Sequence, residues 1–159
     1  MNRFVSNYTL RLDAKGRVSI PAPYRQVLAR DGFDGLYAYP TLDRPAIDAG
    51  GNALLNEIEQ LVESFPPYSE ERENLSAALY GTSETLNVDG EGRVILSERL
   101  KSHAGIVDGV TFVGLGHKFQ IWEPERFRTQ LAEATETVRT LKRQLGSRRA
   151  GREAPGARE

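Results

Sequence analysis

Two short stretches of this 159-residue chain carry side chains that could bind another molecule, and both have the same pattern. Asp13-Ala14-Lys15-Gly16-Arg17 and Asp89-Gly90-Glu91-Gly92-Arg93 both read Asp-x-x-Gly-Arg, with an apolar alternation before and after. In a tight turn, the Asp can accept hydrogen bonds from nearby backbone N–H groups, and the Gly can take a positive φ. The Arg presents a planar guanidinium that donates to paired acceptors. Two copies in one context indicate an internal duplication.

The segments around each motif predict a strand-turn-strand hairpin. Residues 8–12 alternate large and polar side chains, which is the period of a half-buried strand. A turn at 13–16 follows, and 17–20 resumes the alternation as the returning strand. The second copy has the same order, with a strand at 85–88, a turn at 89–92 and a strand at 93–96.

Further helices and strands are predicted after each hairpin. Apolar residues at helical spacing indicate helices at 22–30 and 52–65, and Ser69 and Ser97 are suited to cap two more. Buried strands are predicted at 36–39, 108–113 and 119–122. A final helix carries apolar residues at alternating steps of four and three, a seam that needs a partner surface: Phe127, Leu131, Ala134, Val138, Leu141 and Leu145.

Neither half has enough strands or apolar area to be comfortably stable alone, because domains of about 60 residues are marginal. We therefore expect the two hairpins to intertwine and share one core, in an α+β fold with a small β-barrel and helices outside it. The expected organisation is a first repeat at 7–54, a helical linker at 55–82, a second repeat at 83–126, a C-terminal helix at 127–145 and a disordered basic tail at 146–159.

Composition narrows the class of protein. Hydrophobic residues make up 39% of the chain and charged residues 27%, which is typical of soluble domains. The chain has no cysteine, so disulfides and thiolate metal sites are excluded. No apolar run approaches the roughly 20 residues of a membrane helix. We expect a soluble cytoplasmic protein without a membrane partner.

Charge is unevenly distributed along the chain. Residues 1–25 hold five cations against Asp13 alone, whereas seven glutamates in 51–85 face only Arg72, and the end is basic again. This asymmetry favours a polyanion-binding face on a neutralising scaffold, although solvated charged surfaces would give the same pattern.

Enzyme chemistry is not expected. An aspartic-protease dyad needs Asp followed closely by Thr or Ser and Gly, and neither motif has that pattern. His103 and His117 lack paired ligand spacing, and there is no Gly-x-x-x-x-Gly-Lys phosphate loop. We predict no catalytic residue, no metal, no cofactor and no small-molecule substrate.

The chain resembles the MraZ family, whose members contain two tandem SpoVT-AbrB-type swapped-hairpin repeats. The resemblance rests on Tyr8, on 12–21 with Tyr24-Arg25, on Asp89-Gly90-Glu91-Gly92-Arg93, and on Phe119-Gln120-Ile121-Trp122. It implies a DNA-binding transcriptional regulator of the division and cell-wall gene cluster. It also implies a ring-like homo-oligomer, a nucleoid location and short G-rich direct repeats in promoter DNA as the target.

The chemistry of the first motif agrees with this implication. A two-stranded β-ribbon fits the major groove of DNA, and Arg and Lys donate to guanine O6 and N7. We assign direct contacts to Lys15 and Arg17, phosphate contacts to Arg3, Arg11 and Arg25, and turn shaping to Asp13 and Gly16.

In the second motif, a structural turn is the favoured interpretation. Glu91 stands at its tip where the first motif has Lys15, so we assign turn shaping to Asp89, Gly92 and Arg93. Either motif could instead be a stable turn with an internal Asp–Arg pair. An antitoxin-like protein that binds a partner protein as well as DNA remains the alternative function.

Overall fold

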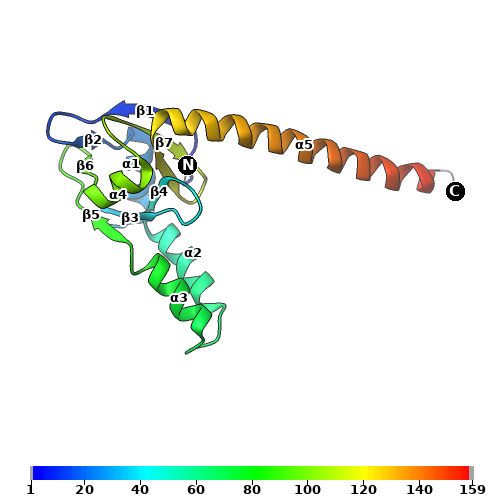
Figure 1. Cartoon of the computed structure of the whole chain (residues 1–159), viewed down its shortest axis with the longest axis horizontal. Coiled ribbons are helices and arrows are strands. Elements are labelled where there is room, and N and C mark those ends of the chain that lie inside the picture. Colours follow the sequence, from blue (N-terminus) through cyan, green and yellow to red (C-terminus); the bar gives the residue numbers. More distant parts are fainter. Residues whose placement is uncertain (1, 158–159) are drawn as a thin grey trace. The chain divides into compact units, whose positions relative to one another are not determined.

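A computed structural model describes the backbone of residues 2–157 and the side chains of residues 2–148. The chain divides into two compact units, Met1–Pro124 and Glu125–Glu159. The elements, most of them labelled in Figure 1, are β1 (Asn7–Arg11), β2 (Arg17–Ser19), α1 (Ala22–Asp31), β3 (Leu36–Pro40), β4 (Ala46–Gly50), α2 (Asn52–Glu63), α3 (Glu70–Leu79), β5 (Glu84–Leu86), β6 (Arg93–Ile95), α4 (Glu98–Ala104), β7 (Gly109–Gly114), β8 (Phe119–Trp122) and α5 (Pro124–Ala157).

The duplication predicted from the sequence is visible in the order of elements. Each half has a strand, a turn, a short strand, a helix and two further strands, and α2 and α3 lie between the halves. The larger sheet has the antiparallel order β1-β7-β8-β4-β3-β5, which is symmetric about its centre. The first strand of each half thus pairs with the third strand of the other half, and the two fourth strands, β4 and β8, pair with each other.

The predicted pairing within each hairpin is wrong. β1 pairs with β7, and β2 pairs with β6 in a separate two-stranded ribbon. Within the first motif, only the turn closes, through the bonds from Asp13 N to Arg17 O at 2.8 Å and from Gly16 N to Asp13 O at 2.9 Å. The cross-pairing places Val18 opposite Val94, and both are buried. Burial of each valine stabilises the fold by about 1.5–3 kcal/mol, so the shared core selects this pairing.

The expected closed barrel is likewise not found in residues 2–157. The larger sheet is open, because its outer strands β1 and β5 each have a single neighbour. The ribbon strands β2 and β6 contain three residues each and pair only with each other. Within the described residues the fold is therefore mixed α+β, with a six-stranded open sheet and a separate two-stranded ribbon.

One hydrophobic core joins the two halves, as expected. Side chains from β2, β6, α1, α4 and the central strands contribute to it. Tyr24 of α1 is its largest fully buried residue, and its hydroxyl donates to Ser6 O at 2.7 Å. Its ring packs against Phe4 and Phe119 at centroid distances of 5.2 and 4.9 Å. Because both repeats supply this core, its burial depends on the presence of both halves.

The helices largely agree with the prediction. Ser69 Oγ accepts from Arg72 N and Ser97 Oγ accepts from Leu100 N, both at 3.2 Å, so both predicted caps are confirmed. Tyr24, Val27 and Leu28 are buried on one side of α1. On α2, Leu54, Ile58 and Val62 are buried, whereas Leu61 is 47% exposed.

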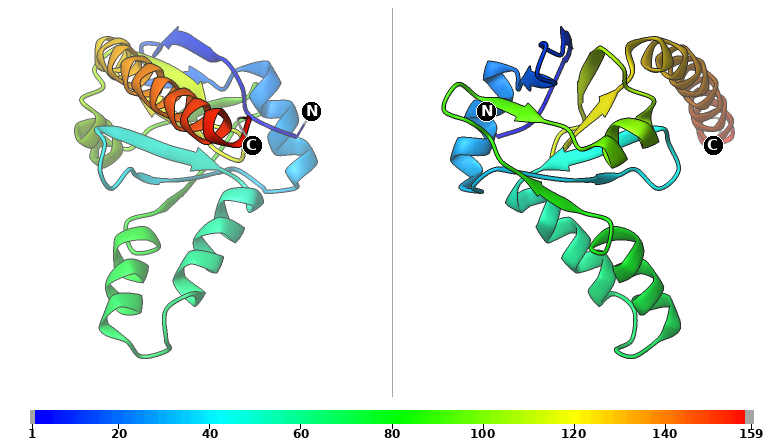
Figure 2. Two further views of the ribbon diagram at one scale, coloured as in Figure 1. Left: turned by 90° about the vertical axis from the view of Figure 1, so that its right-hand side faces the viewer. Right: turned by 60° about the vertical axis from the view of Figure 1, so that its left-hand side comes forward.

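The helices α2 and α3 form an arm that projects from the sheet (Figure 2). A second, smaller core holds this arm to β3 through Tyr37 and Tyr39. Six glutamates lie on the two helices against Arg72 alone, so the arm is acidic. The predicted linker therefore has its own packed structure, which separates its acidic surface from the ribbon.

The last helix is longer than predicted. α5 continues to Ala157, whereas the sequence predicted its end at Leu145 and a disordered tail from Gly146. Isolated glycines cost a helix only about 1 kcal/mol each, and the arginines and alanines around them favour it. Residues 158 and 159 lie outside the described residues. None of the described helices combines the length and the apolar character that a membrane crossing requires.

Candidate nucleic-acid interface

The first Asp-x-x-Gly-Arg motif folds into a turn organised by its aspartate. Asp13 Oδ1 accepts from the backbone N–H groups of Lys15 and Arg17, each at 2.9 Å. Gly16 has a φ of 80°, which a residue with a Cβ adopts at a cost. Arg17 Nε donates to Asp13 Oδ2 at 2.8 Å. The carboxylate therefore orients the guanidinium through Nε and leaves both terminal NH₂ groups for another acceptor.

The second motif repeats this geometry. Asp89 Oδ1 accepts from Glu91 N and Arg93 N, each at 2.9 Å, and Gly92 also has a φ of 80°. Arg93 Nε donates to Asp89 Oδ2 at 2.9 Å. Both turn assignments made from the sequence thus have a geometric basis.

The carboxylates of both turns are held in the charged state. The N–H of Arg17 is the main cause of the lowered pKa of Asp13, and that of Arg93 is the main cause for Asp89. In return, the hydrogen bond to Asp89 raises the pKa of Arg93. An ionised aspartate is acceptor-only, so it can hold several donors at once.

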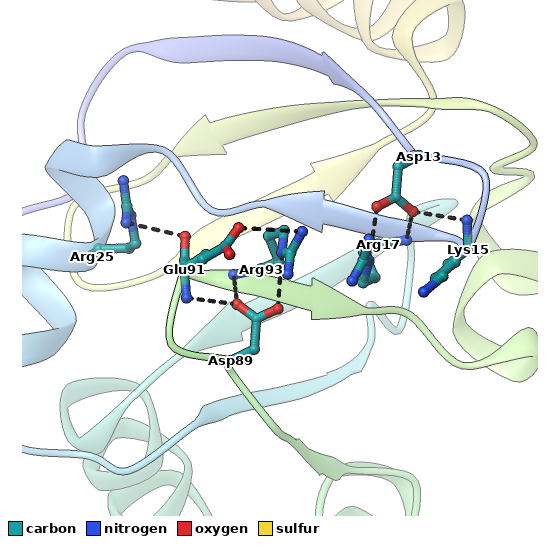
Figure 3. A network of polar contacts seen from close by, with 7 residues as sticks. All are labelled: Asp13, Lys15, Arg17, Arg25, Asp89, Glu91 and Arg93. Carbon is teal, nitrogen blue, oxygen red and sulfur yellow. Dashed lines mark hydrogen bonds and ion pairs between the residues drawn. The ribbon is translucent and has the colours of Figure 1, made fainter.

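The pairing of β2 with β6 brings the two arginines to one surface. The register places Arg17 opposite Ile95 and Ser19 opposite Arg93. Side chains alternate across a strand, and Val18 and Val94 point into the core, so these four residues share the outward face of the ribbon. The two turns lie at opposite ends of the ribbon (Figure 3). A two-stranded ribbon with an outward arginine near each end has the dimensions to enter a major groove.

The other predicted contact residues are not all close to the first turn. Arg11 ends β1, two residues before Asp13, and Lys15 is exposed at the tip of the turn. Neither side chain makes an ion pair or a hydrogen bond with residues 2–148, so both cations are available to an anion. Arg3 lies beyond the other end of β1, beside the bridge from Phe4 to Gly116, and is separated from the turn by the length of the strand.

Arg25 lies against the second turn. Its Nη1 donates to Glu91 O at 3.4 Å, and its side chain covers the Cα of Gly92. The sequence contains no local signal for this contact, because the two residues are separated by 66 positions along the chain.

Sequence reasoning missed three residues of this surface. Ser19 and Ile95 share the outward face with the arginines, and Ile95 is 55% exposed. The two-residue alternation from Arg17 would have identified Ser19. Glu91 was treated only as an unfavourable charge, but its carboxylate pairs with Arg93, with 3.3 Å from Oε2 to Nη1.

The acidic and histidine side chains in the described part of the chain do not form a candidate metal centre. Residues 2–148 contain no group of three or more His, Asp or Glu that could hold a metal ion. Among residues 2–148, the buried carboxylate is that of Asp48, which accepts from Thr41, Lys118 and Gln120 at 2.8–3.0 Å. Its bonding capacity is used within the sheet, which is the arrangement of a structural polar cluster.

Comparisons with known proteins agree with the resemblance noted from the motifs. Residues 79–147 match the family described as "MraZ protein, putative antitoxin-like". The chain is 69% identical over 148 residues to "Transcriptional regulator MraZ" of Xanthobacter autotrophicus, an alignment covering 93% of this chain and 94% of that relative. The protein of the same name in Methylocella silvestris is 62% identical over 164 residues, with all of both chains covered. That of Rickettsia bellii is 45% identical over 134 residues, with 84% of this chain and 87% of the relative covered. The chain belongs to the MraZ family.

Proposed function

We propose that this protein is a DNA-binding transcriptional regulator and that the β2–β6 ribbon is the element that enters the major groove. The observation that carries the proposal is the state of Arg17. Its Nε is bound to Asp13, its side chain is 27% exposed, and no described residue occupies its terminal NH₂ groups. Those two groups are the donors that bind guanine O6 and N7 together.

The surroundings of Arg17 supply the non-specific part of the binding. Lys15 and Arg11 are exposed, unpaired cations on the same segment, and each can neutralise one phosphate. Arg3 and Arg25 extend this role to phosphates farther along the duplex. The acidic arm α2–α3 lies on a different part of the fold, where it does not oppose the approach of DNA (Figure 2).

The finer parts of the proposal concern the target and the assembly. One ribbon offers a single bidentate arginine contact, worth about 1–3 kcal/mol of base discrimination. We infer that a ring-like homo-oligomer presents several ribbons to short G-rich direct repeats, because linked weak contacts multiply affinity. The exposed apolar seam of α5 supports assembly, with Leu131, Val138, Leu141 and Leu145 each 47–59% exposed. The proposed target is the promoter of the division and cell-wall gene cluster, and the proposed location is the nucleoid.

The same seam favours the second candidate function. In an antitoxin-like protein, a helix with an exposed apolar seam would bind a partner protein, while the ribbon would still bind DNA. The two candidate functions differ in what binds the seam of α5, which is another copy of the chain in the first and a partner protein in the second. In both, Arg17 contacts DNA.

The test is DNA binding by the variant Arg17→Ala. We expect its affinity for a duplex of tandem G-rich repeats, followed by fluorescence anisotropy, to fall at least about tenfold. Affinity for scrambled DNA should change much less, because only phosphate contacts remain there. Arg72→Ala is the control, since it removes one cation from the acidic arm and should bind the repeats like the unaltered protein. Equal affinities of the Arg17→Ala variant and the unaltered protein would refute the assignment.

A further inference from the structure

The two turns of the ribbon have matching backbones but different side-chain partners. The aspartate accepts the same two backbone N–H groups at 2.9 Å in each, and the glycine has the same φ of 80°. The exposed fractions of the arginines also match, at 27% for Arg17 and 26% for Arg93. Backbone shape and burial therefore cannot distinguish the two ends of the ribbon for DNA.

The difference lies in the guanidinium groups. Arg17 is bound through Nε alone, by Asp13. Arg93 Nε donates to Asp89 Oδ2 at 2.9 Å, and Nη1 of Arg93 also forms an ion pair with Glu91 Oε2 at 3.3 Å (Figure 3). Bidentate donation to a guanine needs two adjacent N–H groups of one fork. The Glu91 carboxylate therefore competes with a guanine for Nη1 of Arg93, whereas neither terminal NH₂ group of Arg17 has a competing acceptor among the described residues.

Glu91 also changes the field at its end of the ribbon. Its side chain is 74% exposed, so its charge faces solvent where Lys15 faces solvent at the other end. A phosphate approaching the first turn meets a cation, whereas one approaching the second turn meets a carboxylate. Both effects of Glu91 act in the same direction.

We propose that Glu91 keeps Arg93 from contacting DNA, so that the ribbon binds DNA through its Arg17 end and in one orientation. The inference rests on the proposed DNA binding by the ribbon and adds a specificity determinant to it. A ribbon with equal ends would bind a site in either orientation. A ribbon that binds only through its Arg17 end has one orientation on each site, which is what direct repeats require of neighbouring subunits.

The first test is a charge series at position 91. Glu91→Gln should remove the ion pair to Arg93 Nη1, and Glu91→Lys should make the second tip resemble the first. We expect both variants to bind a G-rich duplex more tightly at low salt. For Glu91→Lys, the plot of log affinity against log salt should steepen by about one. Glu98→Gln is the matched control, because Glu98 is 91% exposed and lies on α4 outside the ribbon.

Arg93 gives a second readout of the same idea. Arg93→Ala should lower affinity by a larger factor in the Glu91→Lys protein than in the otherwise unaltered protein, and equal factors in the two backgrounds would contradict the inference. Equal affinity and salt slope for the Glu91 variants and the unaltered protein would overturn the inference. If Arg17→Ala weakens binding in the same experiment while the Glu91 variants do not change it, only the inference about Glu91 fails. If Arg17→Ala has no effect either, the proposed DNA binding by the ribbon fails as well.

The polarity itself can be mapped with a tethered cleavage reagent. The chain has no cysteine, so Gly90→Cys creates a unique attachment point at the second tip, where an added Cβ meets no atom within 4 Å. A DNA-cleaving iron chelate attached there should cut on one side of each repeat. The same chelate on the Gly90→Cys/Glu91→Lys protein should cut on both sides. Cleavage on both sides without the Glu91 substitution would contradict a polar ribbon.

Discussion

At the scale of single residues, each turn depends on one carboxylate that performs two tasks. Asp13 accepts two backbone N–H groups, which closes the turn, and it accepts Arg17 Nε, which orients the guanidinium. This explains why an anion stands within a surface that we propose to bind DNA. The Asp13 carboxylate is engaged by hydrogen bonds within the turn, so an approaching phosphate contacts the cations around Asp13.

The turn should be sensitive to acid. The pKa of Asp13 in the folded protein lies below its ordinary value of 3.8, chiefly because the N–H of Arg17 donates to the carboxylate. The ionised carboxylate of Asp13 therefore stabilises the fold fully at a pH above its ordinary pKa. This stabilisation is lost as the pH falls through the lower pKa of the folded state. We predict that Asp13→Asn lowers the free energy of unfolding at neutral pH, and that the deficit shrinks below about pH 4.

The measurement is urea unfolding of both proteins between about pH 7 and about pH 2. Asp34→Asn is the control, because Asp34 is exposed and its carboxylate makes no hydrogen bond or ion pair with residues 2–148. A deficit that stays constant across this range would show that the charge of Asp13 does not support the turn.

At the scale of elements, the ribbon links the two repeats. β2 comes from one half and β6 from the other, and they meet through Val18 and Val94, each 1% exposed. The outward residues of the same strands form the candidate interface. The position of Arg17 relative to Arg93 thus depends on packing between the repeats.

Removing part of one valine should therefore destabilise the whole first unit. We predict that Val94→Ala lowers the free energy of unfolding by about 2 kcal/mol, from lost burial and the cavity left behind. In a double-mutant cycle with Val18→Ala, the two changes should couple by at least about 0.5 kcal/mol, because the side chains are directly opposed. Denaturant unfolding measures both quantities.

Ile95→Ala is the matched control on the same strand. Ile95 points outward and is 55% exposed, so its truncation should change stability by less than about 0.5 kcal/mol. Strictly additive effects of the two valine substitutions would mean that β2 and β6 do not pair in solution.

At the scale of the whole molecule, a hydrophobic seam on α5 remains exposed in the single chain. Val138, Leu141 and Leu145 are each more than half exposed, and they repeat at the steps of a helix-packing seam. Exposed apolar side chains in such a row indicate an interaction surface. A regulator that gains affinity by assembly has a use for this surface.

We predict that Leu141→Glu lowers the mass of the assembly, because a charge in the seam disfavours its burial. Light scattering after size exclusion gives the mass, and the thermal unfolding of the first unit should not change. Thr140→Glu places the same charge one residue away from the seam and should leave the mass unaltered. An unchanged mass for the Leu141 variant would exclude the seam from self-assembly and favour the partner-protein alternative.

Much of the local structure was predictable from the sequence. The duplicated motif indicated two turns, and its Asp and Gly have the bonding and the φ that such turns need. Ser69 and Ser97 identified two helix starts, because a cap depends on residues within one turn of helix. β4 was missed, because Ala46-Ile47-Asp48-Ala49-Gly50 is buried throughout and so lacks the alternation of a half-buried strand.

What only the tertiary structure decided was the partner of each element. No local pattern predicts that β1 pairs with β7 or that β2 pairs with β6, because strand pairing depends on which apolar faces meet in the shared core. The positions of Arg25 on Gly92 and of Arg93 on the same face of the ribbon as Arg17 follow from that pairing. The sequence by itself determined two nearly identical turns, since turn geometry is local. Their place at opposite ends of one ribbon was decided by the burial of Val18 against Val94, a contact between residues far apart in the chain.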